Sequence, residues 1–520
     1  YISNLKNPTI ENVTIEWENG PKNRSISKPN IIVVLVDDLG FNQISSYGGG
    51  MSNGNFKTPN IDNLANDGVL CTNGYSSSPI CSPSRASLLT GRFATRFGYE
   101  FTPTTSSMMK AISLFSKKNE VADGIYYNKR EENIIDIEQM GLPQSEKTIA
   151  EMLKPEGYHN IHIGKWHLGH ANDFLPRKHG FDESLRIDQG SLFLPEDDKN
   201  VINAKLEFDP IDKVLWGNLP YAVNFNEGPR MNPDGHLTDY LTNEAVKVIE
   251  KNKNRPFFLY LAYWAVHSPL QATKEDYEKL SFIENHDERV LASMVMTVDR
   301  GVGKIRDVLK KNNIDDNTII IFTSDNGAPG YIGLPDLNKP YRGWKLTHFE
   351  GGVHVPFIVS YPNKIPKGTT YNGRVSNLDI LSTVASVAGV DMNRNDLKEI
   401  EFDGANVLPY LIGENEGEPQ RVLFNKSGNY SFIIKEGWKL QVDLVQNKKW
   451  LYNLKEDPTE QVNLIKSDLE KLNELEKILN KKLSEQVKPI WPSLLDWPIF
   501  IDKTLDETVN KNDEYIFWAN

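Results

Sequence analysis

The feature that most restricts the fold of this chain is a set of short apolar runs, each followed closely by charged or polar side chains. Residues 31–36 (IIVVLV) precede Asp37 and Asp38, and the run is rich in β-branched residues. Such a run is typical of a strand that is buried on both faces of a parallel sheet. The pattern returns three times: residues 161–163 precede Lys165 and His167, residues 257–266 precede His267, and residues 318–322 precede Asp325 and Asn326.

Helical patterns lie between these runs, at residues 148–154, 237–251 and 289–311. Alternation of strands and helices predicts an α/β fold in which helices flank a large mixed, mostly parallel sheet on both faces. Ligands bind such sheets outside the carboxyl ends of the strands. The polar residues that end the four runs are therefore expected to form one site.

The pattern changes after about Gly413. Short strand-like segments separated by turn residues predict an antiparallel sheet, and they lie at residues 430–435, 438–444 and 450–453. A charged helix is expected at residues 467–486, and the aromatic-rich tail, residues 489–520, is expected to pack back on the body. We therefore divide the chain into a main domain that carries the site, residues 28–413, and a smaller C-terminal α+β subdomain with its tail, residues 414–520.

Composition excludes several classes of protein. Of the 520 residues, 39% are hydrophobic and 25% are charged, which suits a folded chain with a sizeable core. The 58 Lys and Arg against 70 Asp and Glu give a net charge of −12, the wrong sign for a general nucleic-acid binder. No apolar run approaches the roughly 20 residues that span a bilayer. Two cysteines, Cys71 and Cys81, are too few for a disulfide scaffold, although one disulfide between them is a structural alternative.

Four oxygen donors follow two of the apolar runs. Asp37 and Asp38 come after the first run, and Asp325 and Asn326 come after the last. Taken alone, these are ordinary polar residues at strand ends. Because the pattern occurs on two strands, the sequence favours a metal site, and oxygen donors favour Ca²⁺ or Mg²⁺ over zinc.

Cys81 opens the segment CSPSRASLLTGR, which ends at Arg92. Residues 84–90 have the pattern of a helix that stops near Gly91, so residue 81 is expected at a helix N-terminus, where free N–H groups favour anions. The segment resembles the signature of the type I, formylglycine-dependent sulfatases of the alkaline-phosphatase superfamily. Other similar stretches occur in the family's order: Asp37-Asp38, residues 164–169 (GKWHLG), 267–269 (HSP), 324–327 (SDNG), 342–345 (RGWK), 350–352 (EGG) and 450–458 (WLYNLKEDP).

The resemblance implies an alkaline-phosphatase-like fold and a hydrolase of sulfate esters. In the family, a maturation enzyme oxidises the motif cysteine, here Cys81, to formylglycine, and the hydrated aldehyde is the nucleophile. The resemblance implies Ca²⁺, with Mg²⁺ less favoured, bound by Asp37, Asp38, Cys81, Asp325 and Asn326. It also implies the following roles: Arg85 orients the formylglycine, Lys165 and Lys345 bind sulfate oxygens, His167 is the base, and His267, with help from Lys345, is the acid for the leaving alcohol.

The composition and insertions resemble sulfatases of marine Bacteroidetes that degrade algal polysaccharides. We therefore expect a sulfated oligosaccharide or polysaccharide as substrate, with ulvan favoured and carrageenan next. The polar stretch at residues 100–140 is expected to form a wall of the cleft. Further candidates for substrate binding are His170, Asp173, Arg177, His179 and His348.

Two alternatives stay open. A phosphonate monoester or phosphodiester hydrolase of the same superfamily would share the cysteine motif and the metal cluster. An unmodified Cys81 would instead leave a protein that binds sulfated glycans without turnover. Because the chain begins at Tyr1 without an apolar leader, we expect a removed signal peptide and a periplasmic or secreted protein.

Overall fold

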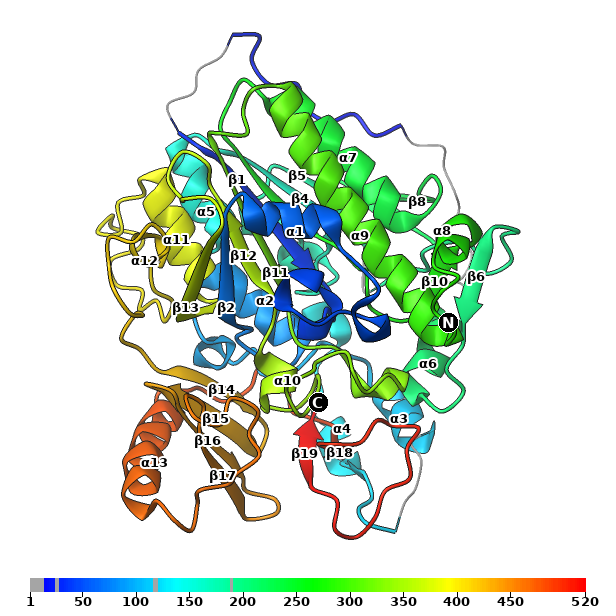
Figure 1. The fold of residues 1–520 in the computed structure, drawn as a ribbon, viewed down its shortest axis with the longest axis vertical. Helices are drawn as coiled ribbons and strands as arrows, with labels where there is room; N and C mark the ends of the chain where they lie inside the picture. The colour runs from blue at the N-terminus through cyan, green and yellow to red at the C-terminus, as the bar shows by residue number, and fades with distance from the viewer. Residues whose placement is uncertain (1–13, 24–27, 116–119, 188–189) are drawn as a thin grey trace.

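The fold is taken from a computed structural model that describes residues 14–23, 28–115, 120–187 and 190–520 (Figure 1). Its centre is one ten-stranded sheet. From edge to edge the strands are β13 (Thr369–Ser376), β2 (Val69–Tyr75), β12 (Phe357–Ser360), β11 (Thr318–Ser324), β1 (Asn30–Val36), β9 (Phe257–Ala262), β4 (His159–Lys165), β5 (Glu183–Ile187), β7 (Val223–Phe225) and β8 (Arg230–Met231).

The middle of this sheet is parallel. Val33 of β1 pairs with Ile321 of β11 on one side and with Tyr260 of β9 on the other, and β9, β4 and β5 continue in the same direction. Strand β12 runs antiparallel to both of its neighbours, and β7 runs antiparallel to β5. The predicted mixed, mostly parallel sheet is confirmed.

Helices cover both faces of the sheet, because both faces of β1 are apolar. Ile32, Val34 and Val36 belong to the core beneath α1 (Pro59–Asn66), α7 (Leu237–Asn252) and α9 (His286–Lys311). Ile31, Val33 and Leu35 belong to the opposite core, beneath α2 (Cys81–Thr90), α5 (Ile149–Leu153) and α11 (Asp379–Ala388). Figure 1 shows α7 and α9 on one side of the strands and α5 and α11 on the other.

One predicted strand is too long. The apolar run at residues 257–266 is a strand only as far as Ala262, where β9 ends. Beyond it, the N–H of Tyr263 donates to the carbonyl of Leu35, and residues 265 and 266 bond to the backbone of Asp37. These residues are apolar because they are buried, and their hydrogen bonds hold the segment that follows β1.

The C-terminal subdomain is an antiparallel sheet, as predicted, with one strand more than expected. Its strands are β14 (Leu423–Ser427), β15 (Tyr430–Lys435), β16 (Trp438–Asp443) and β17 (Lys448–Asn453). Ile433, Leu440 and Leu451 pack against Leu475 and Leu479 of α13 (Leu469–Ser484), which is the predicted charged helix. The apolar stripe of α13 faces the sheet, and its charged side chains face solvent.

The tail packs back on the body, as predicted. Strand β18 (Leu495–Phe500) pairs with β19 (Tyr515–Ala519) and with β3 (Ile125–Tyr126). Shorter elements complete the fold: α3 (Ser106–Phe115), α4 (Asn128–Glu131), β6 (Val201–Ala204), α6 (Pro210–Asn218), β10 (Leu270–Thr273), α8 (Lys274–Lys279), α10 (Glu350–Val353) and α12 (Leu408–Leu411). None of the helices in the described ranges combines the length and apolar character needed to cross a membrane.

Candidate active site

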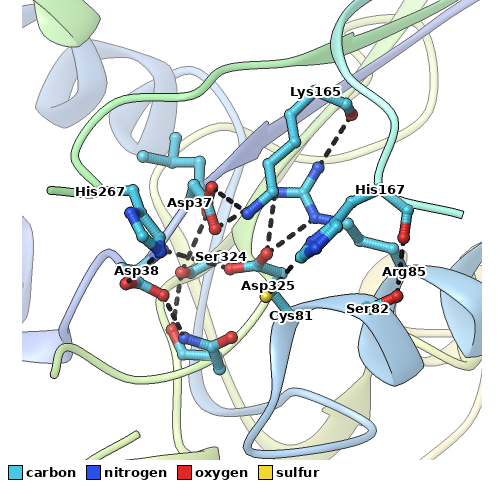
Figure 2. A network of polar contacts seen from close by, with 12 residues as sticks. Asp37, Asp38, Cys81, Ser82, Arg85, Lys165, His167, His267, Ser324 and Asp325 are labelled. Atoms are coloured by element: carbon cyan, nitrogen blue, oxygen red, sulfur yellow. Dashed lines mark hydrogen bonds and ion pairs between the residues drawn. The ribbon is translucent and has the colours of Figure 1, made fainter. Parts of the chain in front are cut away.

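The site lies where four neighbouring parallel strands end. Asp37 and Asp38 follow β1, Asp325 follows β11, Lys165 is the last residue of β4, and His267 lies beyond β9. Since β11, β1, β9 and β4 are adjacent in the sheet, their carboxyl ends meet at one edge. Figure 2 shows these side chains converging, with Cys81 and Arg85 of α2 facing them.

The acidic part of the cluster fits a divalent cation. Ligand atoms of Asp37, Cys81 and Asp325 all lie within 4.8 Å of one another. Asp38 is tied to this group, because its Oδ1 accepts from Asn326 Nδ2 at 2.7 Å. Within the described residues, the buried Oδ1 atoms of Asp37 and Asn326 accept no hydrogen bond. Buried oxygens that accept no hydrogen bond are costly, and a cation would satisfy them.

Three cations neutralise the three carboxylates. The Arg85 guanidinium lies 2.8 Å from Asp325 and 3.4 Å from Asp37, while Lys165 Nζ lies 2.6 Å from Asp37. Lys345 Nζ lies 2.8 Å from Asp38. All six side chains are almost fully buried. The formal charges of the cluster therefore cancel before any cation is added.

The electrostatics divide the carboxylates. Burial alone would raise the pKa of Asp37, but Lys165 and Arg85 outweigh it and hold this pKa well below its usual range. Burial, together with the charge of Asp37, raises the pKa of Asp325 above its usual range. In the absence of a cation, Asp37 is the firmly ionised member of this pair.

Cys81 is the first residue of α2, as the motif predicted, and α2 ends at Gly91 in the left-handed region (φ 64°). The Sγ atom of Cys81 lies 3.4 Å from His167 Nδ1. Burial raises the pKa of the thiol, so the unmodified residue is a poor nucleophile. Cys71 and Cys81 are both free, so the alternative of a disulfide between them is wrong.

The two catalytic candidates among the histidines are each held by a short hydrogen bond. The carbonyl of His167 accepts from Ser82 Oγ at 2.6 Å, which fixes this residue beside α2. Nδ1 of His267 donates to the carbonyl of Ser268 at 2.6 Å, so Nε2 faces Asp38, with 3.5 Å between Nε2 and a carboxylate oxygen. Burial lowers the pKa of both rings, that of His267 to about 4.

Two aromatic residues of the site were missed at the sequence level. The Tyr331 hydroxyl lies 3.1 Å from Lys345 Nζ and 3.3 Å from Asp38. The Trp264 ring stacks on His267 with 4.3 Å between ring centroids, and Lys165 Nζ lies 4.6 Å from its centroid. Trp264 belongs to an apolar run that was interpreted as strand, and nothing in the pattern around Tyr331 marked it.

The substrate-binding candidates divide by exposure. Asp173 and Arg177 are exposed and His170 is half-buried, so these residues can meet a ligand. His179 and His348 are both 0% exposed. The His348 ring stacks on Tyr430 and its Nε2 bonds to Asn425 at 3.0 Å. We remove His179 and His348 from the set, because both rings are fully buried and pack against the aromatic rings of Trp166 and Tyr430.

A strand-end cluster of this kind, facing a cysteine at a helix N-terminus, defines an alkaline-phosphatase-like α/β protein. The chain belongs to the sulfatase family: the model of that family, described as Sulfatase, matches residues 29–390. A second model, N-sulphoglucosamine sulphohydrolase, C-terminal, matches residues 343–489.

Relatives and solved structures agree with this family. Human N-acetylgalactosamine-6-sulfatase is 33% identical over 388 residues, which cover 74% of this chain and 66% of the human protein. The structure of Ps i-CgsB with k-i-k-neocarrahexaose has a TM-score of 0.73 at 30% identity, covering 89% of this chain and 95% of that one. PsFucS1 sulfatase from Pseudoalteromonas sp. has a TM-score of 0.65 at 25% identity, covering 88% and 90%.

Proposed function

We propose that the protein hydrolyses sulfate esters of a sulfated carbohydrate. The observation that carries this proposal is the position of Cys81, at the N-terminus of α2 and within reach of the strand-end carboxylates. A sulfate ester is anionic, so attack at sulfur needs concentrated positive charge around its oxygens. A divalent cation added to the neutral cluster would give this buried site a formal charge of about +2.

The residues present fit Ca²⁺, with Mg²⁺ second. Asp37, Asp38, Asp325 and Asn326 would hold it, together with the modified residue 81. The ion would supply positive charge to the sulfate and would lower the pKa of the nucleophile. A formylglycine at position 81 would supply, as its hydrate, one hydroxyl for attack at sulfur and a second for the later release of sulfate. Formation of the formylglycine would require a maturation enzyme as a partner.

The remaining roles belong to side chains that surround residue 81. Arg85 orients residue 81 and is itself held by its ion pair with Asp325. Lys165 and Lys345 bind sulfate oxygens. His167 lies beside residue 81 and takes the proton when sulfate is expelled. His267 is proposed to give a proton from Nε2 to the leaving sugar oxygen, because an alkyl alcohol is a poor leaving group. This role requires the anionic ester to raise the pKa of the ring, which burial lowers to about 4 in the protein alone.

The substrate is a sulfated glycan of algal type. The likeness to i-CgsB, whose structure contains k-i-k-neocarrahexaose, supports carrageenan oligosaccharides and moves them ahead of ulvan, which the sequence favoured. The likeness to PsFucS1 sulfatase adds fucoidan to the candidates. His170, Asp173 and Arg177 are proposed to contact the sugar. From the resemblance to polysaccharide sulfatases we place the protein in the periplasm or outside the cell, and cell fractionation tests this location.

The test is sulfate release from carrageenan, fucoidan, ulvan and glycosaminoglycan oligosaccharides by protein whose residue 81 is confirmed as formylglycine by peptide mass spectrometry. We expect release from one class in the presence of Ca²⁺ and its loss after chelation. Matched phosphate and phosphonate esters are the control. Faster turnover of these esters would favour the phosphonate monoester or phosphodiester hydrolase over the sulfatase. No sulfate release from any substrate would favour the glycan-binding protein.

A further inference from the structure

The backbone that carries Lys345 has little regular structure of its own. Residues 341–349 lie in neither a helix nor a strand. Leu346, directly after Lys345, has φ of 80°, which is unfavourable for a residue with a side chain. Such a conformation persists only where surrounding contacts impose it. We call residues 341–349 the Lys345 loop.

Backbone hydrogen bonds hold the inner side of this loop. The N–H of Lys345 donates to the carbonyl of Ala328 at 3.1 Å, and the N–H of Leu346 donates to the carbonyl of Pro79, just before Cys81, at 3.0 Å. These bonds attach the loop to the site. The C-terminal subdomain holds it as well, because His348 Nε2 bonds to Asn425 at 3.0 Å and Arg342 Nη1 donates to the carbonyl of Glu460 at 3.0 Å.

The tail holds the outer side of the loop through Arg342. Its Nε donates to Asp502 at 2.9 Å, and Nη2 bonds to the same carboxylate and, at 3.0 Å, to Glu514. Asp502 lies just after β18 and Glu514 just before β19. A planar guanidinium held by two carboxylates fixes direction as well as distance.

Trp344, the neighbour of Lys345, makes the second contact with the tail. Its Nε1 donates to the carbonyl of Phe500 at 2.9 Å, and its ring meets Tyr331 edge-on with 6.1 Å between centroids. The tail reaches Tyr331 from the other side as well, because the N–H of Leu505 donates to the carbonyl of Gly330 at 3.1 Å. The tail therefore contacts the residues next to both Tyr331 and Lys345. It is drawn in red beside α10 in Figure 1.

We propose that residues 495–515 of the tail form a positioning element. This element holds Lys345 and Tyr331 in the active site through Trp344 and Arg342. This inference rests on the proposed function for the role of Lys345. The two matched regions end at residues 390 and 489, so residues 495–515 lie outside both. Lys345 has a long flexible stem, and fixing its backbone limits where its ammonium group can reach.

The first variant changes the tail and leaves the Lys345 loop intact, and the second changes the loop residue that bonds to the tail. In the double variant Asp502→Asn, Glu514→Gln, both carboxylates that hold Arg342 become neutral; their side chains are 52% and 42% exposed, so folding is expected to survive. Trp344→Phe is a second variant, which removes the indole donor and keeps an aromatic ring. Asp513→Asn is the matched control, since Asp513 caps the backbone at Asn510 within the same tail and, among the described residues, makes no hydrogen bond or ion pair with the loop.

The first measurement is hydrogen–deuterium exchange of peptides that cover residues 341–350. We expect faster exchange in the double variant and in Trp344→Phe, and unchanged exchange in Asp513→Asn. The second measurement is the affinity of the Ca²⁺-loaded protein for inorganic sulfate, by calorimetry. We expect the double variant to bind about ten-fold more weakly, toward the affinity of Lys345→Met.

Unchanged exchange in the double variant and in Trp344→Phe would overturn the inference. Faster exchange with unchanged sulfate affinity would also overturn it, because the tail would then order the loop without positioning Lys345. If the unaltered protein binds no sulfate, or Lys345→Met binds it normally, the proposed function or the role of Lys345 fails, and the exchange result still decides whether the tail holds the loop.

Discussion

At the scale of single residues, Cys81 carries the clearest prediction. Cys81→Ala should abolish sulfate release and leave the fold intact, because Cys81 is a small side chain whose loss costs about 1 kcal/mol of stability. Sulfate release and thermal unfolding of the same preparation provide the measurement. Appreciable turnover by this variant would contradict the assignment of residue 81 as the nucleophile.

His267 is expected to act on the leaving group. His267→Ala should lower kcat on a sugar sulfate by about 100-fold or more, and should affect 4-nitrophenyl sulfate much less, because a nitrophenolate leaves without protonation. Parallel kinetics on the two substrates provide the measurement. Equal losses on both would mean that His267 is not the acid.

The burial of His179 is expected to make the free energy of unfolding depend on pH. Burial lowers its pKa to about 4, below the value of about 6.5 expected for an unfolded chain. Between these values the unfolded state binds a proton that the folded state does not, so stability falls as the pH falls from 6.5 to 4. His179→Leu should flatten this part of the pH profile by about 3 kcal/mol, measured by urea unfolding. A profile as steep as that of the unaltered protein would exclude the contribution of His179.

The core of the site was predictable from residue order alone. Asp37, Asp325, Lys165 and His267 each follow an apolar run, and parallel strands bring such positions together. His348 is not a substrate contact, because its ring is buried. This burial was not predictable from the sequence, because the neighbour that covers the ring, Asn425, lies far away in the sequence.

At the scale of elements, the stability of helix α2 depends on the residue that caps its C-terminus, Gly91. Gly91 has φ of 64°, and an added Cβ would lie 3.0 Å from Leu381 of α11. Gly91→Ala should therefore lower the free energy of unfolding by about 1–2 kcal/mol. Gly389→Ala is the matched control, because Gly389 has φ of 72° and open space around it. A loss no greater at residue 91 than at residue 389 would show that the contact with Leu381 is unimportant.

Strands were predicted best where pairing and burial coincide. Residues 31–36 and 318–322 lie within β1 and β11, which are buried on both faces and paired on both sides. Residues 263–266 are equally apolar and leave the sheet. Hydrophobicity reports burial, and it does not report whether a backbone pairs with a neighbouring strand.

At the scale of the whole molecule, the cation is expected to stabilise the fold. Ca²⁺ at about 100 times its Kd would add about 2.7 kcal/mol of stability by binding the folded state alone. The chelated protein should therefore unfold at a lower temperature than the Ca²⁺-loaded protein, measured by scanning calorimetry. Asn326→Leu should shrink this difference. The same unfolding temperature with chelator and with Ca²⁺ would contradict the metal site.

The fold class and the order of elements were predictable for the molecule, and the contacts between its parts were not. The division at residues 413 and 414 stays a prediction. A buried network crosses it: Lys439 of β16 lies 2.8 Å from Glu350 of α10 and 3.0 Å from Glu460. These three residues lie far apart in the sequence, and no local pattern connects them.

The two free cysteines would give a direct measure of the proposed maturation. Oxidation of Cys81 to an aldehyde would remove one of the two thiols in the chain and leave only Cys71, which is 0% exposed. In a denatured sample, a thiol reagent should therefore count two groups per chain before conversion and one after it. The departure of this count from two equals the fraction of chains converted, so every rate constant can be expressed per mature molecule.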